Sequence, residues 1–160
     1  MRHYSRHRTA KAVFPVWKAS ALHWLLAVAA ACLLLSPARA APLTPAGERA
    51  VRTVVQDQLN ALARDDAVKA FSFAAPNVRQ AVGSPEAFLA MVQLGYPVVY
   101  RPASVAFLKA EGNGDQAIQR VRMVDADGDA WLATYSLELQ KDRSWRITGC
   151  NIVPSKGRMA

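Results

Sequence analysis

The residues with the clearest potential for ligand chemistry gather where a helical region gives way to predicted strands. Tyr96, Tyr100 and Arg101 lie in one short stretch, and Arg120 and Arg122 alternate with apolar residues, so that they share one face of a later strand. An arginine guanidinium binds carboxylates through paired N–H groups, and a tyrosine hydroxyl adds a single donor. The pattern predicts a site for a small amphipathic or anionic ligand. The alternative is that the tyrosines pack in the core and the arginines are solvated on the outer face.

Two carboxylates offer a catalytic alternative. Asp66 or Glu86, placed in a pocket beside the Tyr100 hydroxyl, would supply general acid–base chemistry for a small-molecule isomerase or dehydratase. Each also has a simpler structural role. Asp66 follows Asp65 between two predicted helices, where it can cap the second, and Glu86 falls in the first turn of a later helix. The sequence leaves both interpretations open.

Several common chemistries are excluded once residues 1–40 are set aside. The rest of the chain has no histidine and one cysteine, Cys150. It therefore lacks the base of Ser-His-Asp or Cys-His catalysis and the usual ligands of a transition metal. The aspartates of Asp125–Asp129 are spaced like the start of a calcium loop, but Ala130 stands where an EF-hand needs glycine. We expect no metal and no cofactor, a buried and inert Cys150, and a hairpin turn at the aspartates.

Residues 1–40 have the three-part layout of a secretory signal peptide. A basic segment precedes an apolar run from Ala21 to Leu35, and small residues then stand at −3 and −1 of a cut after Ala40. As a helix the run would extend roughly 22 Å, short of the roughly 30 Å hydrocarbon core. We expect cleavage between Ala40 and Ala41 and a periplasmic or secreted protein with no membrane span. An uncleaved anchor is the alternative.

The net charge supports this division of the chain. The whole sequence has 20 basic and 12 acidic residues, a net of +8, but six of the basic residues and none of the acidic ones fall in residues 1–40. Residues 41–160 therefore hold 14 basic against 12 acidic residues, a net of +2. So weak a charge gives no strong field for phosphate backbones, and we expect no nucleic-acid partner. The length predicts one domain over 41–154, followed by a flexible tail over 155–160.

The first half of this domain has helical patterns and the second half strand patterns. Start signals at Thr44, Asp66, Pro76 and Ser84 predict helices over about 45–64, 67–74, 77–82 and 85–95. The stretches expected to be extended are 98–100, 104–110, 116–124, 130–140 and 145–153, and turns are expected at 111–115, 125–129 and 141–144. Helices first and a meander afterwards predict an α+β fold, with N-terminal helices packed on a curved antiparallel sheet.

Three aromatic residues of the predicted strands are expected to anchor the core. Trp131, Tyr135 and Trp145 stand at strand positions that must face inward. Tyr135 is also a candidate ligand contact, because a buried aromatic residue of a pocket presents both an apolar ring and a hydroxyl.

Several motifs resemble known proteins. The long amphipathic helix, the Arg64–Asp66 junction with its short phenylalanine-containing helix, and the strand at Ser144–Ile147 are similar to the nuclear-transport-factor-2-like, or cystatin-like, superfamily. The segments that more narrowly resemble domain-of-unknown-function family 4864 are Phe71–Pro76, Gly83–Phe88, Met91–Val92, Tyr96–Pro102, Trp131–Tyr135 and Trp145–Cys150. The resemblance covers nearly all of residues 47–154. It implies a curved sheet that wraps helices into a cone with a pocket at its open end, in short exported bacterial proteins without an established activity.

The resemblance constrains the fold more than the function, since this fold hosts enzymes, binding modules and oligomer-forming domains. It also implies that Asp65 and Asp66 stand where enzymes of the superfamily often carry pocket residues. We expect a noncatalytic module that binds a small ligand, or that forms a homodimer through its sheet face. The alternative remains an isomerase-like or dehydratase-like enzyme that uses a pocket carboxylate with a tyrosine.

Overall fold

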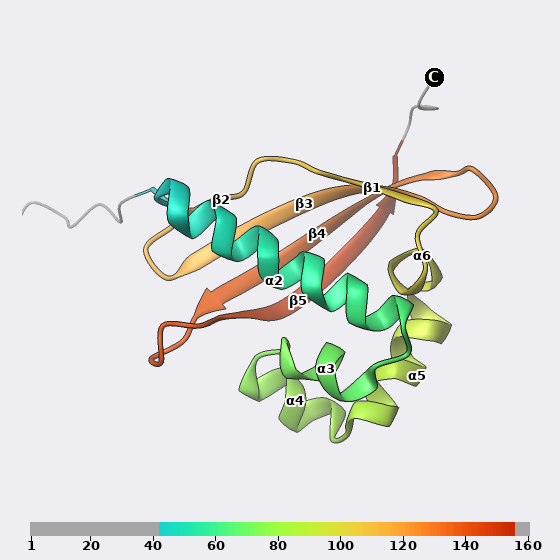
Figure 1. The fold of residues 1–160 in the computed structure, drawn as a ribbon, viewed down its shortest axis with the longest axis horizontal. Helices are drawn as coiled ribbons and strands as arrows, with labels where there is room; N and C mark the ends of the chain where they lie inside the picture. Colours follow the sequence, from blue (N-terminus) through green and yellow to red (C-terminus); the bar gives the residue numbers. More distant parts are fainter. Residues whose placement is uncertain (1–41, 156–160) are drawn as a thin grey trace, which may run out of the picture. The chain divides into compact units, whose positions relative to one another are not determined.

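The computed structural model describes residues 42–155, drawn in colour in Figure 1. The predicted signal peptide with its cleavage site, and residues 156–160 of the predicted tail, lie outside the described residues. The helices are α2 (Pro45–Ala63), α3 (Ala67–Ser72), α4 (Pro76–Val82), α5 (Pro85–Gly95) and α6 (Pro97–Tyr100). The strands are β1 (Ser104–Phe107), β2 (Glu111–Asn113), β3 (Gln116–Val124), β4 (Ala130–Leu139) and β5 (Trp145–Pro154). The predicted α+β fold class is confirmed.

Three of the helices begin where side-chain caps satisfy their first backbone N–H groups. The Gly47 N–H donates to Thr44 Oγ1 at 3.1 Å, and the Ala87 N–H donates to Ser84 Oγ at 3.1 Å. At the start of α3 the Lys69 N–H donates to Asp66 Oδ1 at 3.0 Å. These caps are the predicted ones, because a short polar side chain at this position can reach the free donors of the first turn.

Two local expectations are wrong. Residues 98–100 are not extended. They belong to α6, a single turn in which the N–H groups of Val99 and Tyr100 donate to the Tyr96 carbonyl. The turn expected at 111–115 is limited to residues 114–115, because Glu111–Asn113 forms β2 beside β3. Gly112 permits this pairing, since a Cβ there would lie 2.3 Å from the Gln116 carbonyl oxygen.

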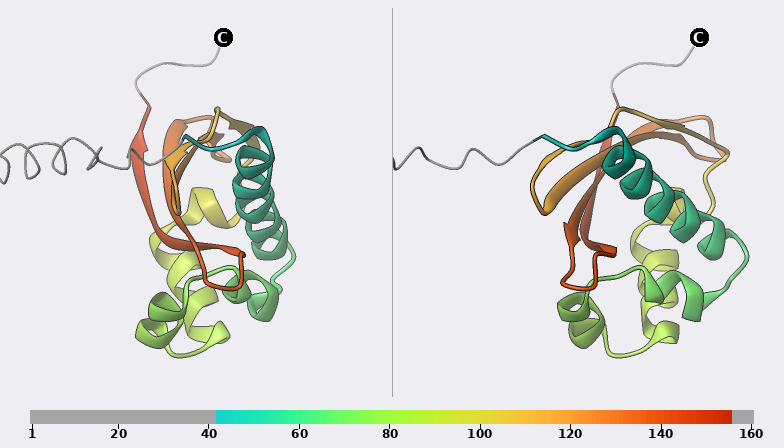
Figure 2. Two further views of the ribbon diagram at one scale, coloured as in Figure 1. Left: turned by 90° about the vertical axis from the view of Figure 1, so that its left-hand side faces the viewer. Right: turned by 60° about the vertical axis from the view of Figure 1, so that its left-hand side comes forward.

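The five strands form one antiparallel sheet in the order β1-β3-β4-β5, with β2 pairing along the same edge of β3 as β1. Helix α2 lies along one face of this curved sheet, as the side view in Figure 2 shows. Helices α3, α4 and α5 lie together beyond the C-terminal end of α2. Among the described residues, no helix covers the opposite face of the sheet. The two sheet faces therefore have different surroundings, and the alternation of side chains along each strand decides which residues meet the helices.

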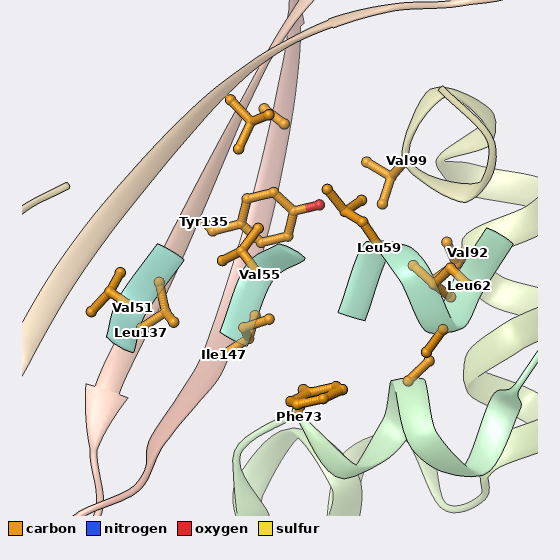
Figure 3. Close-up of a cluster of buried hydrophobic side chains, with 14 of the residues drawn as sticks. Val51, Val55, Leu59, Leu62, Phe73, Val92, Val99, Tyr135, Leu137 and Ile147 are labelled. Atoms are coloured by element: carbon orange, nitrogen blue, oxygen red, sulfur yellow. The ribbon is translucent and has the colours of Figure 1, made fainter. Parts of the chain in front are cut away.

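The core lies between α2 and the concave face of the sheet. Val51, Val55 and Leu62 of α2 are fully buried. Figure 3 shows Val51 and Val55 beside Leu137 and Tyr135 of β4, and Leu62 beside Val92 of α5. The apolar stripe of this amphipathic helix, formed by Val51, Val55, Leu59 and Leu62, is therefore its buried side. Tyr135 and Trp145 are buried at 1% and 7% exposure, whereas Trp131 is half-buried at the margin.

The backbone of the chain between α3 and α4 bonds to the outer edge of β5. The Ile147 N–H donates to the Phe73 carbonyl at 2.9 Å, and the Ala75 N–H donates to the Ile147 carbonyl at 2.8 Å. Ala74 thus forms a parallel bridge with Ile147. The bridge attaches the group of short helices to the sheet.

Within residues 42–155, no helix combines the length and the apolar character needed to cross a bilayer.

Candidate functional site

A cavity of about 270 Å³, which we call the inner cavity, lies between the helices and β5. Its lining residues are Gln58, Leu62, Ala74, Val78, Val82, Phe88, Met91, Val92, Tyr96, Val99, Tyr135, Ile147, Gly149 and Cys150. Helices α2, α4, α5 and α6 all contribute residues to this wall. Helix α3 contributes none, but Ala74 of the segment that follows it is part of the lining. The lining is mostly apolar and includes no charged side chain, so the cavity is suited to an uncharged guest.

The wall of the inner cavity depends on an irregularity in the sheet. The pairing of β4 with β5 shifts between Ser136 and Leu137, so that Cys150 rather than Gly149 stands opposite Tyr135. The shift therefore brings the Cys150 thiol to the concave face of the sheet, beside the buried Tyr135.

Two side chains that line the inner cavity, Cys150 and Tyr135, have raised pKa values and are neutral near pH 7. Burial raises the pKa of the Cys150 thiol to about 11. The pKa of the Tyr135 phenol is raised well above its ordinary value, first by burial and then by the neighbouring Cys150. The Tyr135 hydroxyl has no hydrogen-bond partner among the described residues. The expectation that Cys150 is an unreactive thiol agrees with this environment, because the thiolate is the nucleophilic form.

A second and more open hollow, which we call the outer groove, adjoins the inner cavity. Its volume is about 690 Å³. Arg101, Asp125 and Trp131 are among its lining residues, and Tyr96 and Cys150 line both hollows. These two side chains thus stand at the boundary between the apolar inner cavity and the more polar outer groove.

The expected cluster of tyrosines and arginines is divided among separate places. Tyr96 and Tyr135 line the inner cavity, but Tyr100 does not. The Tyr100 hydroxyl instead donates to Asp65, and Arg101 Nη2 lies 2.7 Å from Asp65 Oδ2. Asp65 has a backbone φ of 57°, a strained value for a residue other than glycine, and its side chain joins the α2–α3 junction to the end of α6. We call this contact the Asp65 clamp.

Arg120 and Arg122 lie on the sheet face that turns away from the helices. Val121 and Met123, which alternate with them on β3, are fully buried against the core. Arg120 instead pairs with Glu111 of β2 through two hydrogen bonds of 3.0 Å. The structure therefore does not bring these arginines together with the tyrosines, because their strand alternation places them on the opposite face.

The two candidate catalytic carboxylates lie outside the inner cavity. Asp66 caps α3, as described above. Glu86 is in the first turn of α5, and its pKa is lowered by hydrogen bonds from its own backbone N–H and from Ser84. A general acid at neutral pH needs a raised pKa, so the shift of Glu86 has the opposite sign.

The aspartate-rich turn is held by its own backbone. Asp125 Oδ1 accepts from the N–H groups of Asp127 and Asp129, at 3.1 and 2.9 Å, and Asp125 Oδ2 accepts from the Trp131 indole at 2.7 Å. These bonds are those of a hairpin turn, as expected. Over residues 42–155, no group of three or more histidine, cysteine, aspartate or glutamate side chains is arranged to hold a metal ion.

The sequence matches the model of a family described as a domain of unknown function, DUF4864, over residues 45–160. The chain belongs to the DUF4864 family. A comparison with curated proteins finds no match to this sequence.

Two solved structures share the fold of this DUF4864 domain. One is an NTF-2-like protein of unknown function from Silicibacter pomeroyi DSS-3, with 20% sequence identity, a TM-score of 0.50, and coverage of 71% of this chain and 100% of the other. The other is a protein of unknown function with a cystatin-like fold from Nostoc punctiforme PCC 73102, with 13% identity, a TM-score of 0.51, and coverage of 73% and 97%. At these identities the similarity establishes the fold alone.

Several residues around the cavity of the DUF4864 domain were not predicted from its sequence. Gln58, Val78 and Val82 line the inner cavity, and the first is buried at 4% exposure. Gln58 had a visible signal, since a polar residue within the apolar stripe of α2 needs a buried partner. It finds one in the Ala70 carbonyl, to which Gln58 Nε2 donates at 3.2 Å. Val78 and Val82 had no such signal, because spacing along a short helix does not say what the helix covers.

Proposed function

We propose that this chain is a noncatalytic binding module for a small, largely apolar molecule held in the inner cavity. The observation that carries the proposal is a cavity of about 270 Å³ with an apolar lining and no charged residue in it. Cavities that hold drug-sized ligands have volumes of roughly 300–1,000 Å³, so this cavity suits a smaller molecule. Binding of an apolar guest is favourable because the guest leaves water, and no charged group has to be desolvated.

The adjoining outer groove supports the amphipathic form of the ligand. Tyr96 and Cys150 line both hollows, so a guest can place its apolar part inside and direct a polar end past these residues toward the outer groove. The carboxylates of Asp125 and Asp127 and the ion-paired Arg101 give that groove no net positive charge. They do not favour an anionic end.

The enzymatic alternative has less support. A carboxylate inside the inner cavity would be needed beside a tyrosine hydroxyl, and none lines it among the described residues. Asp66 is engaged in capping α3, and Tyr100 belongs to the Asp65 clamp.

Ethylbenzene titration of the isotope-labelled chain tests the proposal. We expect saturable changes of the amide signals of Ile147, Gly149 and Cys150, which line the inner cavity. Val82→Trp should abolish them, because the larger ring fills the cavity from α4. The matched control is Ala81→Trp, which adds the same ring at an exposed position of the same helix. Equal loss in both variants, or no saturable change in the original chain, would contradict the proposal.

Two further parts of the proposal concern the chain in the cell. We propose export of the chain and removal of residues 1–40, and N-terminal sequencing of the protein recovered from the periplasm should then begin at Ala41. A homodimer through the uncovered sheet face is the alternative role for this module. Ile118, Leu132 and Val153 give that face some apolar surface among its polar residues. Sedimentation at high protein concentration should detect the dimer, and a strict monomer would argue against it.

A further inference from the structure

The Tyr135 hydroxyl is the one fully buried side-chain nitrogen or oxygen atom of the inner cavity that the described part of the chain leaves without a hydrogen-bond partner. Tyr135 lies in the middle of β4 and is only 1% exposed. Figure 3 shows its oxygen directed away from the sheet, toward Leu59 and Val99. Buried hydroxyl groups in proteins are normally hydrogen-bonded, because removing one from water without a replacement bond costs free energy. Tyr135 and Val99 both line the inner cavity, so an unsatisfied hydroxyl between them indicates where a polar atom of a ligand would bind.

The neighbouring side chains offer no adequate substitute for that ligand atom. The Gln58 amide already donates to the Ala70 carbonyl at 3.2 Å. The Cys150 thiol lies close enough to influence the pKa of Tyr135, but a thiol is a weak hydrogen-bond partner. The other lining side chains, apart from Tyr96, are apolar. A guest with a polar atom at this point would satisfy the Tyr135 hydroxyl better than the protein does.

The absence of charge in the lining limits which kind of ligand atom can bond to the Tyr135 hydroxyl. The lining contains no cation to balance a carboxylate and no anion to balance an amine, and burial keeps both Tyr135 and Cys150 neutral. Arg101, the cationic residue in the lining of the outer groove, is paired with Asp65 at 2.7 Å. A buried and unpaired charge is strongly unfavourable. The phenol is thus left to act as a neutral O–H donor.

We propose that the inner cavity selects an uncharged molecule with a hydrogen-bond acceptor, such as a ketone, aldehyde or ester carbonyl, that accepts a hydrogen bond from the Tyr135 hydroxyl. This inference rests on the proposed function, because it assigns the chemistry of the ligand in the same cavity. Of the small amphipathic or anionic ligand expected from the sequence, this inference keeps the amphipathic form and replaces the anionic form with a neutral one.

Four probes of similar size test the inference: ethylbenzene, acetophenone, benzoate and benzylammonium. Their dissociation constants are measured for the original chain and for Tyr135→Phe, which removes the hydroxyl alone. We expect the substitution to weaken acetophenone roughly 3- to 10-fold, the range of one net hydrogen bond, and to leave ethylbenzene within roughly 2-fold. Benzoate and benzylammonium should bind at least roughly 10-fold more weakly than acetophenone to the original chain.

Two controls make these results interpretable. Tyr135→Phe should keep the circular dichroism and thermal midpoint of the original chain, because the hydroxyl loses at most a weak contact with the Cys150 thiol. Tyr100→Phe removes a tyrosine hydroxyl outside the cavity and should leave the ratio of acetophenone to ethylbenzene affinity unchanged.

The outcomes separate the two proposals. If ethylbenzene binds but Tyr135→Phe does not weaken acetophenone, the carbonyl inference is wrong and the apolar cavity stands as a binding site. Tighter binding of benzoate or benzylammonium than of acetophenone would overturn the selection for uncharged ligands. If neither acetophenone nor ethylbenzene binds, the proposed function itself fails.

Discussion

At the scale of single residues, chemistry in this domain depends more on surroundings than on residue type. Tyr100 and Tyr135 are both tyrosines with a candidate ligand role, yet one belongs to the half-exposed Asp65 clamp and the other is buried in an apolar wall. Cys150 shares that wall and has a pKa raised to about 11. The residue type determines which reaction is possible, and burial, through its effect on the pKa, determines whether the reactive ionised form is present.

The raised pKa of Cys150 predicts slow alkylation. Against an ordinary value of 9.0, a pKa of about 11 makes the thiolate roughly 100-fold scarcer at pH 8. With Cys32 replaced by serine, iodoacetamide should react with the folded chain at least roughly 100-fold more slowly than with the urea-unfolded chain. The folded rate should rise roughly 10-fold per pH unit up to about pH 11. Equal rates for folded and unfolded chains at pH 8 would refute this assignment.

At the scale of elements, caps and turns determine where each segment begins and ends. Asp66 has the geometry of a helix cap, which predicts that its role is structural. Asp66→Ala should lower the free energy of unfolding by about 1 kcal/mol, and Asp66→Ser should restore most of the loss because a serine oxygen can accept the same bond. Urea unfolding measures both. If the serine variant were as unstable as the alanine variant, the Asp66 carboxylate would stabilise the fold in some way other than by capping α3.

The turn at Asp125 predicts an acid-sensitive contribution to stability. The pKa of Asp125 is lowered from its ordinary value of 3.8, and the largest cause is the hydrogen bond from the Trp131 indole N–H. A lowered folded-state pKa stabilises the fold above the unfolded-state value, and the contribution disappears as the pH falls through the folded-state value. The urea midpoint of the original chain should therefore exceed that of Asp125→Asn at pH 7, and the two should converge below pH 3.8. A constant difference at all pH values would show that the charge is not responsible.

Signals within a single element predicted most of the fold, and contacts between elements account for most of what was missed. The caps at Thr44, Asp66 and Ser84 were readable because a cap and its helix are adjacent in sequence. The stretch 98–100 appeared extended because its two valines favour strands, but Pro97 and the Tyr96 carbonyl hold it as one helical turn. The register shift in β5, which sets the position of Cys150, has no signature in the sequence.

The candidate site was predicted less well than the fold for the same reason. Arg120 and Arg122 could have been assigned to the outer face, because they alternate with the apolar Val121 and Met123. The inner cavity itself could not be foreseen. It is the space left where short helices meet a shifted strand, and no single element of the sequence specifies its volume.

At the scale of the whole molecule, the described part of the chain has a hydrophobic core of its own. Its buried and half-buried apolar residues all lie between Leu43 and Ile152. A polypeptide of residues 42–155 should therefore fold with the same thermal midpoint as the full chain, and calorimetry of the two would test this. A midpoint lowered by the truncation would show that residues 1–41 or 156–160 contribute to the fold.

The bridge between Ala74 and Ile147 also bears on how the sheet avoids aggregation. An outermost strand with unpaired N–H and carbonyl groups can template the addition of strands from other molecules, the first step toward a fibril. In β5 both backbone groups of Ile147 are already occupied by Phe73 and Ala75 of the same chain. The short connection between two helices thereby also shields this margin of the sheet from edge-to-edge growth.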